Sequence, residues 1–143
     1  MDNNFRKYPV AFQEIERYLF KAKKDIGVAK KILEISEEAS YKTTYDIMMK
    51  ITLALIMSYG LRPRSKMGHH MTMVNFAKKM LGKENQMLIK KYDKMRKKRH
   101  LLVYEAQWIS RKEVKEAIAL AEKYLKIVKD FIQLKNPQKK LVI

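Results

Sequence analysis

"IMMKITLALIM", residues 47–57, is the stretch that decides the fold, because it is apolar on almost every side of a helix. Such a helix must be covered by neighbouring elements, since burying apolar surface is favourable. A bilayer crossing needs about 20 apolar residues. This run is shorter and is interrupted by Lys50. The sequence therefore predicts a central helix buried inside a bundle.

Signals at both ends set the limits of this central helix. Ser36 is followed by Glu37 and Glu38, which is typical of a capping residue and an acidic first turn. Gly60 suits a left-handed residue at the carboxyl end, and Pro63 forbids continuation. We therefore expect a helix that starts after Ser36 and runs to residue 59.

Further helices are predicted on both sides of the central one. Apolar side chains recur at helical spacing over residues 9–33, 70–81 and 84–102. The capping box "SRKE", residues 110–113, opens a last helix that ends at Asn136-Pro137. No segment indicates a strand. The long helices and short connections predict an all-α fold, an antiparallel bundle of four to five helices. It forms one domain over residues 1–143, with a core at about 9–135 and a basic tail at 136–143.

The composition limits the classes of partner. The formal net charge is +17, which favours nucleic acid, an anionic membrane surface or an acidic protein as partner. The chain has no cysteine, so it forms no disulfide and no thiolate metal site. The polar amino terminus lacks the apolar segment of a signal peptide. We expect a soluble, cytoplasmic protein that does not enter the membrane.

A basic run, "KMRKKRHLLVYE" at residues 94–105, ends the fourth predicted helix. Advancing 100° per residue from Leu88 places Arg99 in the middle of the apolar stripe, with Arg96 and His100 at its edge. The lysines point away from that stripe and are predicted to be exposed, and they could follow a phosphate backbone; they include Lys97 and Lys98.

An arginine that points inward needs a partner, because an unpaired buried charge is costly. Asp25 lies on the apolar stripe of the first helix and is the first candidate, with Glu105 and Asp46 as others. Two interpretations stay open. In the first, Arg99 and its acidic partner line a polar cleft with a function. In the second, they are an ion pair that only fixes the helix register.

The segments "KAKKDIGVAKKIL" (21–33), "GLRPRSKMGHH" (60–70) and "RHLLVY" (99–104) are together similar to the HEPN (higher eukaryotes and prokaryotes nucleotide-binding) domains. The resemblance extends over residues 18–132. It implies a small helical bundle and, in many members, metal-independent RNA cleavage. Other members bind RNA, nucleotides or proteins without cleavage. Many are paired with a minimal nucleotidyltransferase in toxin–antitoxin systems, and members usually form homodimers.

The resemblance also assigns roles to residues. Arg99 matches the signature arginine, His100 the polar residue after it, and Asp25 the acidic residue of the early helix. Tyr104 takes the place of the signature histidine, which is the natural acid–base group near neutral pH. His100 or Tyr104 would then handle protons if the chain cleaves RNA.

A second cationic group precedes the third predicted helix. His69 and His70 follow Gly68 there, and amides at a helix start could hold a phosphate beside Arg62, Arg64 and Lys66. The alternative is a helix start with one packing histidine. No Cys and no His-x-x-x-His spacing indicates a metal, so we expect neither a metal site nor a cofactor. Trp108 either stacks a base or packs at a bundle end or dimer contact.

Three functions fit these observations. The first is a HEPN-like basic module that binds RNA or a nucleotide without efficient cleavage, with a partner in a toxin–antitoxin or defence-type system. The second is a metal-independent endoribonuclease toxin that uses Arg99 with His100 or Tyr104. The third is a pure protein-interaction subunit whose basic surface complements an acidic partner.

Overall fold

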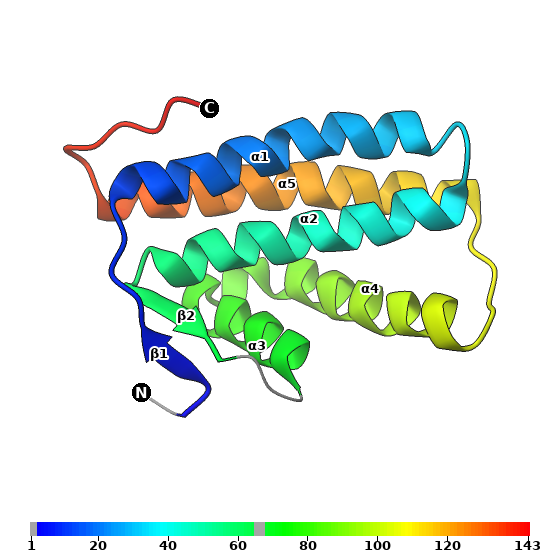
Figure 1. Ribbon diagram of the computed structural model, residues 1–143, viewed down its shortest axis with the longest axis horizontal. Coiled ribbons are helices and arrows are strands. Elements are labelled where there is room, and N and C mark those ends of the chain that lie inside the picture. The colour runs from blue at the N-terminus through cyan, green and yellow to red at the C-terminus, as the bar shows by residue number, and fades with distance from the viewer. Residues whose placement is uncertain (1–2, 65–67) are drawn as a thin grey trace.

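Five helices and one small sheet make up the computed structural model, which describes residues 3–64 and 68–143 (Figure 1). In chain order the elements are β1 (Phe5–Lys7), α1 (Phe12–Ile32), α2 (Glu37–Met57), β2 (Leu61–Pro63), α3 (His69–Leu81), a 3-10 turn (Lys83–Asn85), α4 (Gln86–Tyr104) and α5 (Arg111–Lys135). The all-α class is confirmed. None of the helices within the described residues combines the length and the apolar character that a bilayer crossing requires.

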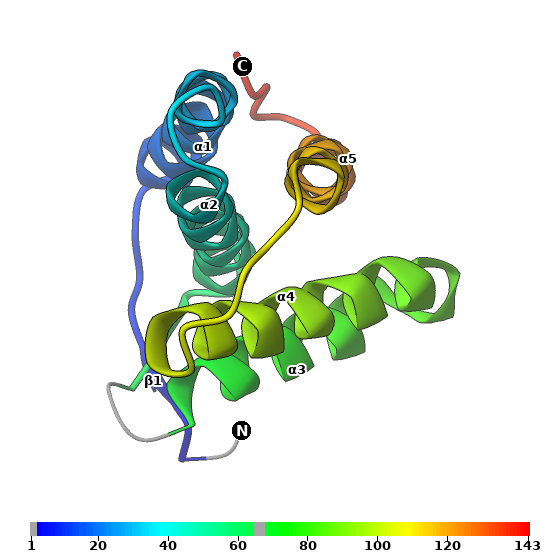
Figure 2. The same ribbon diagram turned by 90° about the vertical axis from the view of Figure 1, so that its right-hand side faces the viewer.

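The helices form two layers. Helices α1, α2 and α5 lie side by side along the long axis, and α3 and α4 cross below them at an angle (Figure 1, Figure 2). α1 and α2 run antiparallel, joined by a short connection. All four other helices pack against α2, which is therefore the centre of the bundle, as its apolar sequence predicts.

Local signals fix the ends of α2 and α5. The Ser36 hydroxyl accepts a hydrogen bond from the Ala39 amide at 3.1 Å, and Ser110 does the same for Glu113 at 3.1 Å. Gly60 has φ of 69°, a conformation that costs glycine little and other residues more. Both predicted caps and the left-handed Gly60 are confirmed, but α2 ends at Met57 rather than at residue 59. The first helix begins at Phe12 rather than at residue 9 and the fourth extends to Tyr104, because capping geometry leaves helix ends ambiguous by a few residues.

The expectation of no strand is wrong. β1 pairs antiparallel with β2, with Phe5 opposite Pro63 and Arg6 opposite Arg62. Three-residue strands are too short to show an alternating pattern in sequence. The pair is held by the buried Phe5 ring, whose centroid lies 5.1 Å from that of Phe76 on α3.

A buried polar network crosses the core beneath α2. The Thr52 hydroxyl lies 2.8 Å from the hydroxyls of both Tyr92 and Tyr124 and donates to the Met48 carbonyl at 2.8 Å. Thr52, Tyr92 and Tyr124 are all fully buried. Burial also raises the pKa of the Tyr92 and Tyr124 hydroxyls, so both stay neutral. One threonine therefore joins α2 to α4 and α5 through hydrogen bonds.

Replacing Thr52 by valine should lower the free energy of unfolding by about 1–3 kcal/mol, because the buried Tyr124 hydroxyl loses its partner and that of Tyr92 keeps only the Met49 sulfur at 3.3 Å, while the side-chain volume is kept. Urea denaturation measures this change. Thr43→Val, on the same helix and outside this network, should change stability by less than about 0.5 kcal/mol. Equal effects of the two substitutions would show that the network contributes nothing.

Candidate functional site

Arg99 turns from α4 toward α2, as its helical position predicts. Its guanidinium carbon lies 5.6 Å from the centroid of the Tyr45 ring, a cation–π distance. Tyr45 is fully buried, and Arg99 is half-buried. The Nε atom of Arg99 is itself buried and has no hydrogen-bond partner within the described residues. A buried donor without a partner is costly, so this atom needs a structural or functional explanation.

His70 completes the group from the start of α3. Its Nδ1 lies 3.1 Å from the Tyr45 hydroxyl, and the two ring centroids are 5.7 Å apart. His70 is thus the packing histidine of the pair at residues 69 and 70. The side chains of Arg99, Tyr45 and His70 come from three helices, α4, α2 and α3. We call these three side chains the arginine cluster.

The electrostatics of the arginine cluster favour a neutral histidine. Burial lowers the pKa of His70, and the positive charge of Arg99 lowers it further. Burial raises the pKa of Tyr45, against the effect of Arg99 and Arg96. At neutral pH the cluster therefore holds a neutral tyrosine, an imidazole biased toward its neutral form, and one guanidinium. The negative charge of Asp46 acts on the pKa of both rings in the sense opposite to Arg99, but Asp46 forms no ion pair with Arg99 among the described residues.

The predicted acidic partners of Arg99 are wrong. Asp25 is partly buried on α1 but accepts from Lys50 and Lys21, both at 3.0 Å. Burial alone would raise the pKa of Asp25, but the hydrogen bonds from these two lysines outweigh it and lower the pKa. The predicted pair of Asp25 with Arg99 does not form, because Lys50 on the neighbouring α2 reaches Asp25 instead. Glu105 is exposed, and no ion pair joins Asp46 to Arg99 among the described residues.

The cations next to Arg99 on α4 have different partners. Asp93 accepts from Arg96 at 2.8 Å and lies 3.4 Å from Lys97. The hydrogen bond from Arg96 holds the pKa of Asp93 below its usual range. Lys97 is exposed, as expected. Lys98 was expected to be exposed but is half-buried, because its ammonium group donates to the Trp108 carbonyl at 3.0 Å.

The two residues predicted to handle protons lie on the outside of α4. The rings of His100 and Tyr104 contact one another in a tilted arrangement with centroids 4.7 Å apart, and Tyr104 is 68% exposed. Trp108, in the following loop, is 92% exposed. The imidazole of the arginine cluster is therefore that of His70, a residue predicted for binding. His100, which was predicted to handle protons, is not part of the cluster.

The other predicted binding residues gather near the sheet. Arg62 lies on β2 with its guanidinium carbon 4.9 Å from the Tyr8 ring centroid. Arg64 is exposed, and its carbonyl oxygen is 3.3 Å from Nδ1 of His69. Lys66 lies outside the described residues. The two adjacent histidines thus have different partners. His69 contacts Arg64, which is near it in the chain, whereas His70 reaches Tyr45 on α2.

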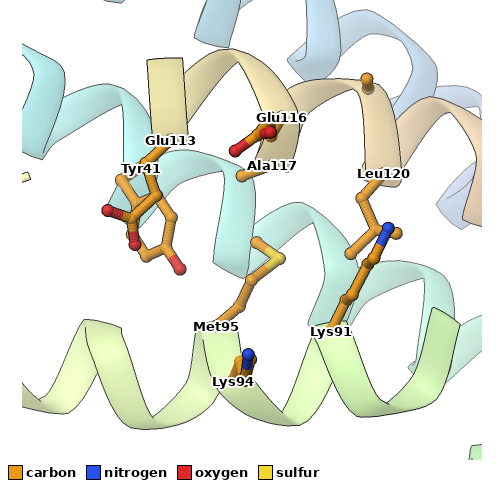
Figure 3. A pocket seen from close by; sticks show the side chains of 9 residues that line it. Tyr41, Lys91, Lys94, Met95, Glu113, Glu116, Ala117 and Leu120 are labelled. Carbon is orange, nitrogen blue, oxygen red and sulfur yellow. The ribbon is translucent and has the colours of Figure 1, made fainter. Parts of the chain in front are cut away.

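A separate cavity opens between α4 and α5 (Figure 3). It has a volume of about 480 Å³ and is floored by Tyr41, Met95 and Ala117. Lys91 and Lys94 line it from α4, and Glu113 and Glu116 from α5. No member of the arginine cluster lines it, and its mixed charge suits no single anion. The cavity therefore does not contribute to the site around Arg99.

Tyr45 is the functional candidate that the sequence interpretation missed. A signal was present, because Tyr45 and Thr52 carry hydroxyl groups seven residues apart on the helix that the sequence predicts to be central and buried. Seven residues are two helical turns, so both lie on one face of α2. That face meets α4. Within residues 3–64 and 68–143, no group of three or more metal-ligating side chains is present.

The family follows from comparison with known domains. A family model described as "HEPN domain" matches residues 15–131. The chain therefore belongs to the HEPN domain family. A search of curated proteins gave no match.

The His70 imidazole should titrate below about 6.5, the ordinary value for histidine, and Arg99→Gln should raise its pKa. The reason is that removing a nearby positive charge makes protonation of the ring easier. An NMR titration of the imidazole signals measures both values. Arg111→Gln, which removes an arginine paired with Glu34 at 2.7 Å, is the matched control and should leave His70 unchanged. An equal pKa in the wild type and in Arg99→Gln would contradict the proximity of the two groups.

Proposed function

We propose that this HEPN-family chain binds RNA or a nucleotide through a phosphate group at the arginine cluster, without efficient cleavage. The observation that carries the proposal is the buried Nε of Arg99, which lacks a partner among the described residues. Because this atom is buried, a phosphate would reach the guanidinium through its other N–H groups and neutralise its charge there. The net charge of +17 would draw a polyanion to the surface.

The surroundings of Arg99 support phosphate over an acidic side chain. The carboxylate of Asp93 is already held by Arg96 and Lys97, and that of Asp25 by two lysines on α1 and α2. The Tyr45 ring lies 5.6 Å from the guanidinium carbon, and this contact restricts the Arg99 side chain before a ligand binds, which limits the entropy lost on binding. A guanidinium held in this way presents N–H groups in the planar arrangement that matches phosphate oxygens.

The exposed side of α4 would contact the rest of the ligand. Lys97 and Arg96 flank the arginine cluster on this helix, and the His100 ring packs against the exposed Tyr104 ring. Trp108 projects from the next loop. Aromatic faces of this kind stack on bases with little sequence preference. We infer contacts to phosphate and base faces rather than a sequence-specific site.

A second candidate is a metal-independent endoribonuclease, which the neutral bias of His70 beside Arg99 favours. A neutral imidazole would take the proton of a ribose 2′-hydroxyl, whose oxygen attacks the adjacent phosphorus. The bond from phosphorus to the 5′ oxygen breaks, an acid returns a proton to that oxygen, and a cyclic phosphate remains. Arg99 would stabilise the charge on the phosphate. His100 or Tyr104 would supply the acid.

Assembly is part of the proposal. Family members usually dimerise, and Val103, Tyr104 and Trp108 expose apolar surface at the carboxyl end of α4. A homodimer through this end would bring two arginine clusters together. The basic surface would also suit an acidic partner such as a minimal nucleotidyltransferase, in a toxin–antitoxin or defence-type system. A neighbouring gene for such an enzyme would support this part.

Arg99→Gln should weaken binding of a fluorescently labelled single-stranded RNA by about tenfold to a hundredfold. Losing one hydrogen bond from a charged donor costs about 1.5–3 kcal/mol, and about 1.4 kcal/mol is a factor of ten. Fluorescence anisotropy in the presence of chelator measures the affinity, and electrophoresis of the same RNA measures cleavage. Wild-type binding should weaken as salt is added.

Arg111→Gln is the control, because it removes the same charge from an exposed ion pair on α5. Equal loss of affinity in the two variants would mean that only the overall charge matters, and would refute a site at Arg99. Cleavage by the wild type that disappears in both Arg99→Gln and His70→Gln would favour the endoribonuclease instead.

A further inference from the structure

A second group of unpaired cations lies on the small sheet, away from the arginine cluster. The guanidinium carbons of Arg6 on β1 and Arg62 on β2 each lie 4.9 Å from the centroid of the Tyr8 ring. The two arginines are directly opposite one another in the antiparallel register. Both guanidinium groups therefore stack on one aromatic ring.

This arrangement has an electrostatic cost that nothing in the described chain removes. Like charges directly opposite one another across two strands destabilise the pair. None of the ion pairs among the described residues includes Arg6 or Arg62, although nine join other side chains. Stacking offsets part of the repulsion, at about 0.5–1 kcal/mol for each exposed cation over a ring. The charges themselves remain unneutralised.

The backbone holds the two arginines in place. The Tyr8 amide donates to the Gly60 carbonyl at 2.7 Å, and the Arg64 amide donates to the Asn4 carbonyl at 2.8 Å, so pairing extends beyond both strands. Phe5, buried against Phe76, anchors the sheet on α3. A guanidinium stacked by its face leaves its N–H edge open to solvent, where it can donate two parallel hydrogen bonds to a phosphate.

The end of the sheet lies next to the start of α3, because the Arg64 carbonyl oxygen after β2 is 3.3 Å from Nδ1 of His69. In Figure 1 and Figure 2, β1, the start of α3 and the carboxyl half of α4 all lie on the lower side, away from α1 and α5. His70 at the start of α3 belongs to the arginine cluster, and β2 precedes α3 in the chain. The sheet arginines and the arginine cluster are therefore linked through the start of α3, where His69 contacts Arg64 and His70 contacts Tyr45.

We infer that Arg6 and Arg62, stacked on Tyr8, form a second phosphate contact, and that the ligand is a single RNA strand long enough to reach both groups. The inference rests on the proposed phosphate site at Arg99 and extends it. A single nucleotide cannot occupy two separate phosphate contacts. Two contacts along one strand make an oligonucleotide the preferred ligand, because the second contact forms without a further loss of translational freedom.

The test compares ligands of two lengths on the complete chain. The double variant Arg6→Gln/Arg62→Gln should bind a single-stranded RNA of about 12 nucleotides roughly tenfold more weakly than the wild type. The slope of log affinity against log salt should fall by about 1.4, because each phosphate contact on a single strand contributes about 0.7. Affinity for a nucleoside monophosphate should not change. Arg99→Gln should weaken both ligands.

The control is Lys24→Gln/Lys123→Gln, which also removes two exposed positive charges but from α1 and α5. Lys24 lies 5.7 Å from the Phe20 ring centroid, so it too is a cation stacked on an aromatic ring. The control should keep more of the wild-type salt slope than the sheet variant. A sheet variant that matches this control in affinity and slope overturns the inference.

Two further outcomes separate this inference from the proposed function. If Arg99→Gln loses binding while the sheet variant keeps the wild-type salt slope, the site at Arg99 is supported and the second contact is refuted. If the wild type shows no salt-dependent binding of RNA, both are refuted.

Should the glutamine pair disturb folding, as circular dichroism would show, Arg6→Lys/Arg62→Lys keeps the charges. It should retain the slope but lose affinity, since lysine lacks the planar fork; unchanged affinity overturns the inference.

Discussion

Burial of α2 on nearly all sides is the constraint on which the rest of this structure depends. Every other helix packs against it, so the apolar side chains between Ile47 and Met57 have no alternative to the core. The few polar groups on this helix must then find partners inside the protein. Thr52 does so through two tyrosine hydroxyls, and this fixes α4 and α5 relative to α2.

The arginine cluster is an extension of that buried network toward the surface. Tyr45 lies two turns before Thr52 on α2, and its ring centroid is 6.2 Å from that of Tyr92. Arg99 and His70 then contact Tyr45 from outside the core. The position of the guanidinium is thus set by aromatic packing rather than by an acidic partner. A cation held by rings keeps its hydrogen-bonding edge available for an anion, whereas an ion pair would occupy it.

The same physical pattern occurs at the sheet. Tyr8 contacts two guanidinium groups as Tyr45 contacts one, and no ion pair among the described residues includes any of these three arginines. With 32 basic and 15 acidic residues, the chain cannot pair every cation internally. Which cations remain unpaired is decided by geometry. Asp25 and Asp93 each accept from two cations, whereas no described carboxylate is placed to pair with Arg99, Arg6 or Arg62.

Helical periodicity by itself determined the bundle, the ends of α2 at Ser36 and Gly60, and the inward direction of Arg99, because each depends on residues within a few turns of one another. The motif order also determined the family. Only the tertiary structure decided that Lys50 rather than Arg99 reaches Asp25, that Lys98 is drawn to the Trp108 carbonyl, and that His70 joins Tyr45. It also decided the sheet, since two three-residue strands carry no periodic signal. These contacts depend on how far a side chain reaches across to a neighbouring element of the packed fold. Spacing along one helix does not encode that distance.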